Sequence, residues 1–265
     1  MNYQTELNAM LAAAANASRN VLKYYNKNTF SVETKDDNSP VTTADLASNE
    51  IIVECLSRLF PDYAILSEET ADNKNRMQNP YVFIIDPIDG TKDFIAHNNE
   101  FAINIALVHN NEVVAGVVAV PALGLTYFAS KGDGAYLLDQ TQPVDDLKPI
   151  HVTSKTSGLT VLTSRFHYTD SEKSLVEKHK DKIANVKTVG SAYKICCIAQ
   201  GLAEITYRTN PGTKEWDTAA PQIIVEEAGG MFIDLKTMSR MKYNREDVRN
   251  LDGYIVVNRK ENIIL

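Results

Sequence analysis

The hydrophobic pattern is helical at the start of the chain and strand-like through its middle. After about residue 149 the two patterns alternate. Apolar residues from Leu7 to Tyr25 recur with helical spacing, which predicts a long first helix with one buried face. A second helix is expected from about Asp45 to Leu59, with Pro61 marking its end. The segment between them, 31–43, is polar and rich in turn residues.

The next part of the chain favours β-structure. Short apolar runs separated by turn signals such as HNN, PALG and KGDG predict strands that pair in an antiparallel way. The expected strands are 64–66, 81–85, 101–108, 113–120, 125–129 and 135–138.

The stretch DQTQPVDDLKP (139–149) is the best candidate for a domain boundary, because strands and helices alternate after it. The expected strands are 159–163, 186–189, 203–207, 231–234 and 254–257, and the expected helices are 170–179, 192–200 and 219–228. Such alternation predicts layered α/β structure. We therefore expect an α+β domain over 1–146, built on an antiparallel sheet, and an α/β domain over 147–265.

Composition narrows the classes of function. The 265 residues are 44% hydrophobic and 23% charged, which is typical of a soluble globular protein. A net charge of −7 gives no support for nucleic-acid binding, which needs a basic surface. The three cysteines fit neither zinc spacing nor a disulfide framework, and the run MLAAAA is too short to span a bilayer. A cytoplasmic protein with reduced thiols and no integral membrane segment is expected.

The stretch DPIDGTKDF follows directly on the apolar run YVFII and carries the strongest chemical signal. Pro87 disfavours helix at Asp86, so the strand is expected to stop there. Asp86 and Asp89 then flank a tight turn and point into one small volume, where a cation would relieve their repulsion. Such oxygen ligands suit Mg²⁺, and the carbonyl of Ile88 lies in the same turn. On this motif alone, a simple turn and helix cap is a competing interpretation.

Three other stretches place acids in similar positions. LSEE (66–69) follows a short apolar strand, PVTTAD (40–45) ends at the start of a helix, and EWDTAA (215–220) puts Asp217 in the first turn of a helix interrupted by Pro221. Taken singly, each is more often a helix cap or an exposed acid. Together they repeat one arrangement, with acids at strand ends and helix starts.

These motifs resemble those of the inositol-monophosphatase-like superfamily of metal-dependent, lithium-sensitive phosphatases. The paired signatures are DPIDGTKDF and WDTAAPQIIVEEAGG, and the resemblance runs from about Lys35 to Gly230. Within the superfamily, DNSPVT (37–42) and the pair Lys92-Asp93 are similar to the 3'(2'),5'-bisphosphate nucleotidases of the CysQ type. The resemblance implies a layered αβαβα sandwich of the sugar-phosphatase and inositol-monophosphatase type.

The resemblance also implies Mg²⁺ as the cofactor, with two to three ions per site. One ion would use Glu68, Asp86 and the Ile88 carbonyl, and a second would use Asp86, Asp89 and Asp217. A third, weaker ion would lie near Glu68.

Catalytic roles carry over in the same way. Family members use an Asp–Thr pair to orient and deprotonate the attacking water, and the matching residues are Asp45 and Thr91. The amides of Gly90 and Thr91, at a helix N-terminus, suit phosphate oxygens. Lys35 matches a family lysine near the metals, whereas Glu69 is expected to lie outside the ligand set.

Substrate recognition is expected from the second half of the chain, where the resemblance assigns nucleotide contacts to Ser164 and His167 in TSRFH. In VGSAYK (189–194), a strand–turn–helix pattern would let Gly190 and Ser191 present amides to a phosphate. Further candidates for a second phosphate are Lys194 and Arg208. Phe166 departs from the family pattern by replacing a small residue, and this puts substrate preference in doubt.

The implied activity is hydrolysis of adenosine 3',5'-bisphosphate (PAP) to AMP and phosphate, extended to the sulfated analogue PAPS. A sugar or inositol phosphatase with the same metals is the nearest alternative, and a catalytically idle nucleotide sensor is a more distant one. The resemblance implies a monomer or homodimer, with peripheral association at the inner membrane as a further option. The expected partner is a small nucleotide bisphosphate.

Overall fold

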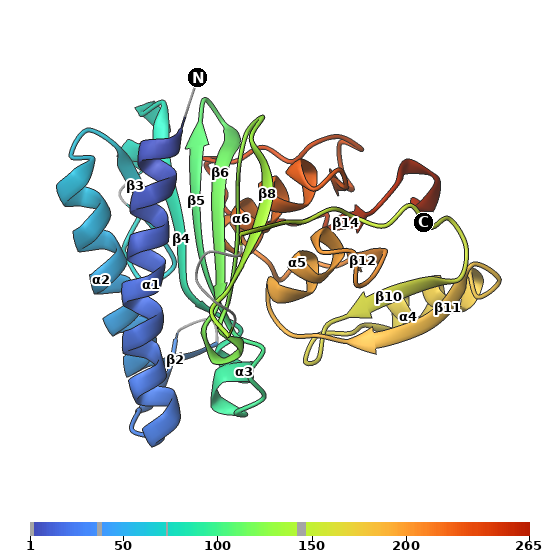
Figure 1. Cartoon of the computed structure of the whole chain (residues 1–265), viewed down its shortest axis with the longest axis horizontal. Helices are drawn as coiled ribbons and strands as arrows, with labels where there is room; N and C mark the ends of the chain where they lie inside the picture. The colour runs from blue at the N-terminus through green and yellow to red at the C-terminus, as the bar shows by residue number, and fades with distance from the viewer. Residues whose placement is uncertain (1–2, 36–38, 73, 142–146) are drawn as a thin grey trace.

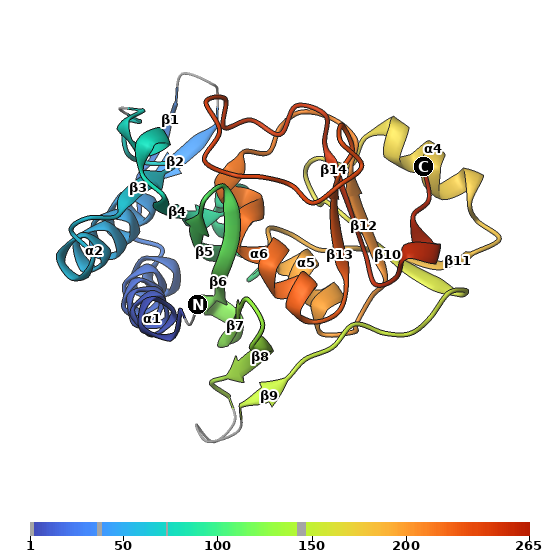
Figure 2. The same ribbon diagram turned by 90° about the horizontal axis from the view of Figure 1, so that it is seen from above.

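Two β-sheets form the centre of the fold, and helices cover both faces of each. The computed structural model describes residues 3–35, 39–72, 74–141 and 147–265. Its layers are α1 and α2, a seven-stranded sheet, α5 and α6, a five-stranded sheet, and α4 (Figures 1 and 2). The expected αβαβα sandwich is confirmed.

The seven-stranded sheet is the larger of the two. Its spatial order follows the chain: β3 (Ala64–Ser67), β4 (Tyr81–Asp89), β5 (Ala102–His109), β6 (Glu112–Val120), β7 (Leu125–Ser130), β8 (Gly134–Asp139) and β9 (Lys148–Pro149). β3 and β4 are parallel, and every later pair is antiparallel.

Strand periodicity divides the apolar run YVFII between two cores. Phe83 and Ile85 pack toward α1 (Gln4–Lys27) and α2 (Thr43–Leu59), whereas Val82 and Ile84 join the core on the other face. Because side chains alternate along a strand, a central strand covered on both sides reads as a continuous apolar run.

The middle helical layer consists of α5 (Tyr193–Ala199) and α6 (Glu215–Glu227). α6 crosses the seven-stranded sheet so closely that a Cβ at Gly116 would lie 2.6 Å from the carbonyl oxygen of Ala220. This close approach brings the start of α6, in the second half of the chain, against the strands of the first half.

The five-stranded sheet forms the next layer. Its order is β11 (Ile183–Thr188), β10 (Leu159–Thr163), β12 (Ile205–Arg208), β14 (Tyr254–Val257) and β13 (Met231–Asp234). α4 (Asp170–Lys178) covers its outer face through Leu175 and Val176, and the short helices are α3 (Thr91–Ile95), η1 (Asn75–Gln78), η2 (Pro121–Leu123) and η3 (Lys260–Asn262).

Three details differ from the sequence expectations. Part of the polar segment 31–43 forms a hairpin of β1 (Val32–Thr34) and β2 (Pro40–Thr42). β4 does not stop at Asp86 but continues to Asp89 through a bulge, which accommodates the proline. α6 begins at Glu215 and continues through Pro221, its seventh residue, where the missing N–H removes only the one hydrogen bond that it would donate four residues back.

The division into domains at 146/147 stays a prediction. Residues 142–146 of the boundary segment, like Asp37 and Asn38 of DNSPVT, lie outside the described residues. β9, just after the boundary, pairs with β8 and thereby extends the seven-stranded sheet. Within the described ranges, no helix combines the length and the apolar character that crossing a membrane requires.

Candidate active site

A bulge in β4 brings two aspartates onto the same face of the sheet. Asp86 pairs with Asn104 and Asp89 with Ala102, so β4 advances three residues where β5 advances two. In a regular strand, residues three apart point to opposite faces, but the extra residue of a bulge shifts Asp89 onto the face of Asp86. The DPID sequence therefore delivers two carboxylates to one point.

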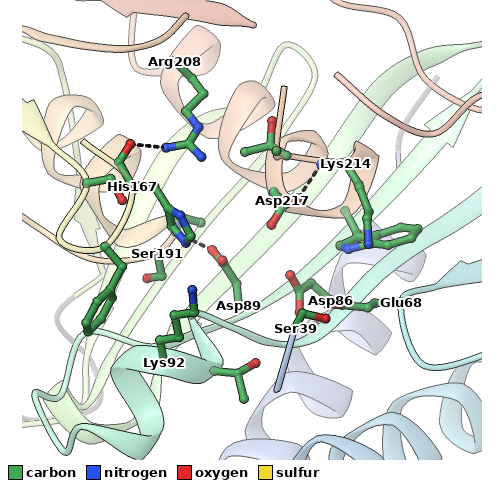
Figure 3. Close-up of a pocket in the computed structure, with 18 of the residues that line it drawn as sticks. Ser39, Glu68, Asp86, Asp89, Lys92, His167, Ser191, Arg208, Lys214 and Asp217 are labelled. Carbon is green, nitrogen blue, oxygen red and sulfur yellow. Dashed lines mark hydrogen bonds between the residues drawn. The ribbon is translucent and has the colours of Figure 1, made fainter. Parts of the chain in front are cut away.

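α6 supplies the third carboxylate. Asp217 lies in the first turn of this helix and accepts a hydrogen bond from the backbone N–H of Lys214, which anchors the start of the helix. Carboxylate oxygens of Asp86, Asp89 and Asp217 lie within 4.8 Å of one another (Figure 3). Residues 128 positions apart in the chain, Asp89 and Asp217, thus share one site.

Burial makes this cluster electrostatically costly without a cation. Burial, with repulsion from Glu68, Asp89 and Asp217, raises the pKa of Asp86 well above its ordinary value. Burial raises the pKa of Asp217 to about 8, with Asp89 adding to the effect. Burial also raises the pKa of Asp89 to about 6.

The donor set fits a hard divalent cation. Oδ1 of Asp86 is buried and has no hydrogen-bond partner, although buried polar atoms are nearly always paired. An unpartnered carboxylate oxygen beside two further carboxylates is what an oxygen-binding ion such as Mg²⁺ requires.

Glu68 lies near this cluster and is bound to a lysine. Lys35, from the segment joining β1 and β2, contacts Glu68 at 2.9 Å and also pairs with Glu69. Burial lowers the pKa of Lys35, but the two glutamates outweigh it and raise that pKa above its ordinary value. Lys35 therefore occupies cation-binding oxygen atoms at the edge of the site.

Asp45 and Thr91 lie next to each other, as the sequence predicts. Oγ1 of Thr91 donates to Oδ1 of Asp45 at 3.2 Å and lies 3.3 Å from the carbonyl oxygen of Ile88. Thr42 forms a capping box with Asp45 at the start of α2. Burial raises the pKa of Asp45 to about 6, and the two hydrogen bonds from Thr42 oppose this rise.

Cationic side chains line the same cavity as the acids. Burial lowers the pKa of Lys194, whose ammonium group donates to the carbonyl of Ser191 at 2.7 Å. Arg208 is buried, donates to the carbonyl of His167 at 2.8 Å, and its Nε has no partner. Burial, with repulsion from Arg208, Lys92 and Lys194, lowers the pKa of His167 to about 4, so its imidazole is neutral at pH 7.

The turn at 190–192 is tied to the acidic strand. The amide of Ala192 donates to Asp89, while the amide of Gly190 donates to Glu100 at 2.8 Å. A Cβ at Gly190 would lie 2.7 Å from the carboxyl group of Asp93, so glycine is needed there for packing. Gly190 therefore differs from its expected role, because its amide already has an acceptor, whereas Ser191 faces the cavity.

One cavity of about 610 Å³ joins these groups. Figure 3 shows Asp86, Asp89 and Asp217 close together, with Lys92, His167 and Arg208 to one side. The predicted residues that line it are Glu68, Asp86, Ile88, Asp89, Gly90, Thr91, Ser164, His167, Ser191, Lys194, Arg208 and Asp217. Asp45 lies behind Thr91, buried and outside the lining.

Sequence reasoning missed several groups around the cavity. Lys214 lies three residues before Asp217, with its ammonium group 5.2 Å from the ring centre of Trp216. Asn104 donates to Asp89 at 3.4 Å and to the carbonyl of Trp216 at 3.3 Å, linking β5 to the start of α6. Lys214 borders a motif that the sequence does mark, whereas nothing in the strand around Asn104 signals its role.

Comparisons with known proteins agree on one family. The model of the inositol monophosphatase family matches residues 2–263. A 3'(2'),5'-bisphosphate nucleotidase CysQ from Buchnera aphidicola is 37% identical over 227 residues, 84% of this chain and 82% of that protein. The Escherichia coli K12 protein of the same name is 33% identical over 232 residues, 86% of this chain and 90% of that one. The crystal structure of CysQ from Bacteroides thetaiotaomicron superimposes with a TM-score of 0.82 at 33% identity, covering 97% of this chain and 99% of that one.

The electrostatics predict how pH affects the metal-free protein. Asp86, Asp89 and Asp217 have raised pKa values, so the folded state binds more protons than the unfolded state above about pH 4. Their contribution to stability is present below pH 4 and is lost as pH rises toward 8. Thermal melts in EDTA should therefore show that Asp86→Asn raises Tm more at pH 8 than at pH 5.

Added Mg²⁺ should have the opposite pH dependence in the wild type. At a fixed concentration, about 100 times the dissociation constant at pH 8, Mg²⁺ should raise Tm by about 5 °C or more at pH 8 and by less at pH 5, where protons compete for the carboxylates. Asp181→Asn, at an exposed position outside the cavity, is the matched control and should behave as wild type. Equal Mg²⁺ stabilisation of the wild type and Asp86→Asn would contradict the assignment.

Proposed function

The chain belongs to the inositol monophosphatase family, and from that premise we propose that it is a 3'(2'),5'-bisphosphate nucleotidase. It hydrolyses adenosine 3',5'-bisphosphate to AMP and phosphate, and we extend the proposal to removal of the 3'-phosphate from PAPS. The observation that carries the proposal is a single cavity lined by three clustered carboxylates and also by Lys194 and Arg208. Such a cavity can hold metal ions together with a ligand that carries more than one phosphate.

The cofactor we propose is Mg²⁺, in two to three ions. Asp86, Asp89 and Asp217 would hold it together with Glu68 and the carbonyl of Ile88. When bound, Mg²⁺ offsets the negative charge of the phosphate and makes water a better nucleophile. Lys35 binds one oxygen of Glu68, which leaves the second carboxylate oxygen for the ion.

Thr91 and Asp45 act on the attacking water. The Thr91 hydroxyl is positioned to orient the water, and Asp45, with its pKa raised to about 6 by burial, is poised near neutrality to accept a proton. The amides of Gly90 and Thr91 begin α3, and the first N–H groups of a helix lack partners within it, so they can bind phosphate oxygens. No covalent phospho-enzyme is needed.

Two cationic residues recognise the second phosphate of the proposed substrate. Lys194 and Arg208 supply the positive charges, while the neutral imidazole of His167 and the hydroxyls of Ser164 and Ser191 offer hydrogen bonds. The cytoplasmic location and the monomeric or dimeric state stay predictions.

The alternatives have less support. A sugar or inositol phosphatase would use the same acids, but the relatives described above are bisphosphate nucleotidases by name. An idle sensor would have no need of the hydrogen-bonded pair Asp45 and Thr91. A panel of adenosine 3',5'-bisphosphate, inositol 1-phosphate and fructose 1,6-bisphosphate, assayed for phosphate release with Mg²⁺ and with EDTA, separates the three. The nucleotidase proposal fails if the bisphosphate nucleotide is not the preferred substrate.

Removing one metal-binding charge should abolish turnover. We expect Asp86→Asn and Asp217→Asn each to lower kcat by about a thousandfold or more, because several kcal/mol of charge stabilisation are lost. Circular dichroism should show an intact fold, and the exposed control Asp181→Asn should keep wild-type activity. Full activity of either site variant would reject the metal assignment.

The Asp45–Thr91 pair should act as a unit. Asp45→Asn and Thr91→Val are each expected to lower kcat by about 10²–10⁴-fold with little change in KM. The double variant should lose little more than the worse single variant, since groups that serve one step are not additive. Kinetics of the four proteins at saturating Mg²⁺ measure this, and multiplicative losses would show independent roles.

Lys194 should discriminate between substrates. Lys194→Ala is expected to raise KM for adenosine 3',5'-bisphosphate about tenfold or more, since it removes a charge-assisted contact to the second phosphate. KM for inositol 1-phosphate should change much less. Lys180→Ala, whose exposed side chain does not line the cavity, is the matched control. Equal effects on both substrates would favour the inositol phosphatase alternative.

A further inference from the structure

Two exposed apolar side chains meet at the same cavity. Phe166 is 44% exposed and Leu251 is 46% exposed, and both line the cavity that holds the buried acids. Single exposed apolar residues are normal on a protein surface and need no explanation. Here, however, two of them come from distant parts of the chain to one cavity, whereas the other large apolar residues exposed within the described ranges do not line it.

The segment that carries Phe166 is fixed on both sides. Arg165 contacts Glu100 at 2.6 Å and Asp93 at 3.5 Å, and both acids belong to the first half of the chain. On the other side, the carbonyl of His167 accepts a hydrogen bond from the buried Arg208. Phe166 therefore lies between two anchored residues, directly after β10, and its ring is held at the cavity without being covered.

Around this cavity three kinds of surface lie within reach of a single ligand. The acidic cluster suits metal ions and the phosphate to be removed, and Lys194 and Arg208 suit a second anion. Neither accounts for an aromatic ring that remains exposed. A planar apolar group on the ligand does account for it, because an aromatic side chain can take a base on its face with little loss of conformational freedom.

We propose that Phe166 is a specificity-determining residue that stacks against the nucleobase of the substrate, with Leu251 adding apolar contact. The inference rests on the proposed function and deepens it. Phe166 distinguishes a nucleoside bisphosphate from a bisphosphate or monophosphate that has no aromatic group.

The test compares two substrates that differ only in the base. One is adenosine 3',5'-bisphosphate, and the other is 1-deoxyribofuranose 3,5-bisphosphate, which keeps the 2-hydroxyl and has hydrogen in place of the base. Phe166→Ala should raise KM for the adenosine compound about tenfold, within the range that stacking on an aromatic ring provides. KM for the abasic compound, and kcat for both, should stay within about twofold of wild type.

Further variants separate stacking from apolar contact and from folding. Phe166→Tyr should keep KM for the adenosine compound near its wild-type value. Phe166→Leu should raise that KM, but by less than Phe166→Ala does. Leu202→Ala removes an exposed apolar side chain outside the cavity and should change neither KM.

The outcomes that would overturn the proposal are distinct. If Phe166→Ala leaves KM for the adenosine compound unchanged, or raises KM equally for both compounds, Phe166 does not read the base. The nucleotidase function itself would still stand in either case. If the wild type turns over neither bisphosphate but does hydrolyse inositol 1-phosphate, the proposed function falls, and this inference falls with it.

Discussion

The close packing of three carboxylates, those of Asp86, Asp89 and Asp217, is the constraint on which the rest of the site depends. Three carboxylates held within 4.8 Å of one another, and largely out of water, repel strongly in the charged form. The backbone imposes this arrangement through a bulge in β4 and the first turn of α6, so the side chains have little room to separate. A fold that keeps such a cluster gives up stability in the metal-free state, and a divalent cation is what restores it. Local violations of this kind are characteristic of functional sites.

A buried polar network brings Asp217 to the other two acids. Arg76, 2% exposed and just before β4, exchanges hydrogen bonds with Asn244, whose backbone N–H donates to Glu215 at 2.7 Å. Asn250 then binds the carbonyl of Lys214, so the segment 244–250 clamps the start of α6. Glu215, whose side chain is fully buried, also pairs with Arg245 at 3.0 Å, and removing one partner of a buried charged pair typically costs about 3–5 kcal/mol. The position of Asp217 is therefore set by residues from both halves of the chain, and the site cannot form in either half alone.

Sequence periodicity predicted most helices and strands because elements with one or two buried faces leave regular apolar patterns, whereas the order of the layers came from the family resemblance. The acids at strand ends were also predictable, since Asp86 and Asp89 follow a clear apolar run. The bulge was not, because Pro87 argues locally for a strand end, and only pairing with β5 shows that the strand continues. Gly190 illustrates a second limit. The sequence suggested that this glycine presents its backbone amide to a phosphate. In the structure, the close approach of Asp93, which is distant in sequence, is what requires a glycine there. Tertiary contacts of this kind leave no local signature.

Charge sharing across the cavity links metal binding to substrate choice. Burial lowers the pKa of Lys194, and Asp89 is the group that most opposes this effect. Asp89 thus serves both as a metal ligand in the proposed site and as the main counterion of Lys194. Once divalent cations neutralise Asp89, the charge on Lys194 and on the nearby Arg208 has lost much of its compensation inside the protein. In the proposed function, a second phosphate on the substrate would supply that compensation, whereas the single phosphate of a monoester would already be bound by the metals. Metal ions and a bisphosphate therefore favour each other's binding, and by linkage the effect must be reciprocal. In the proposed site, the acids whose mutual repulsion favours a cation thereby also favour a substrate with two anionic groups.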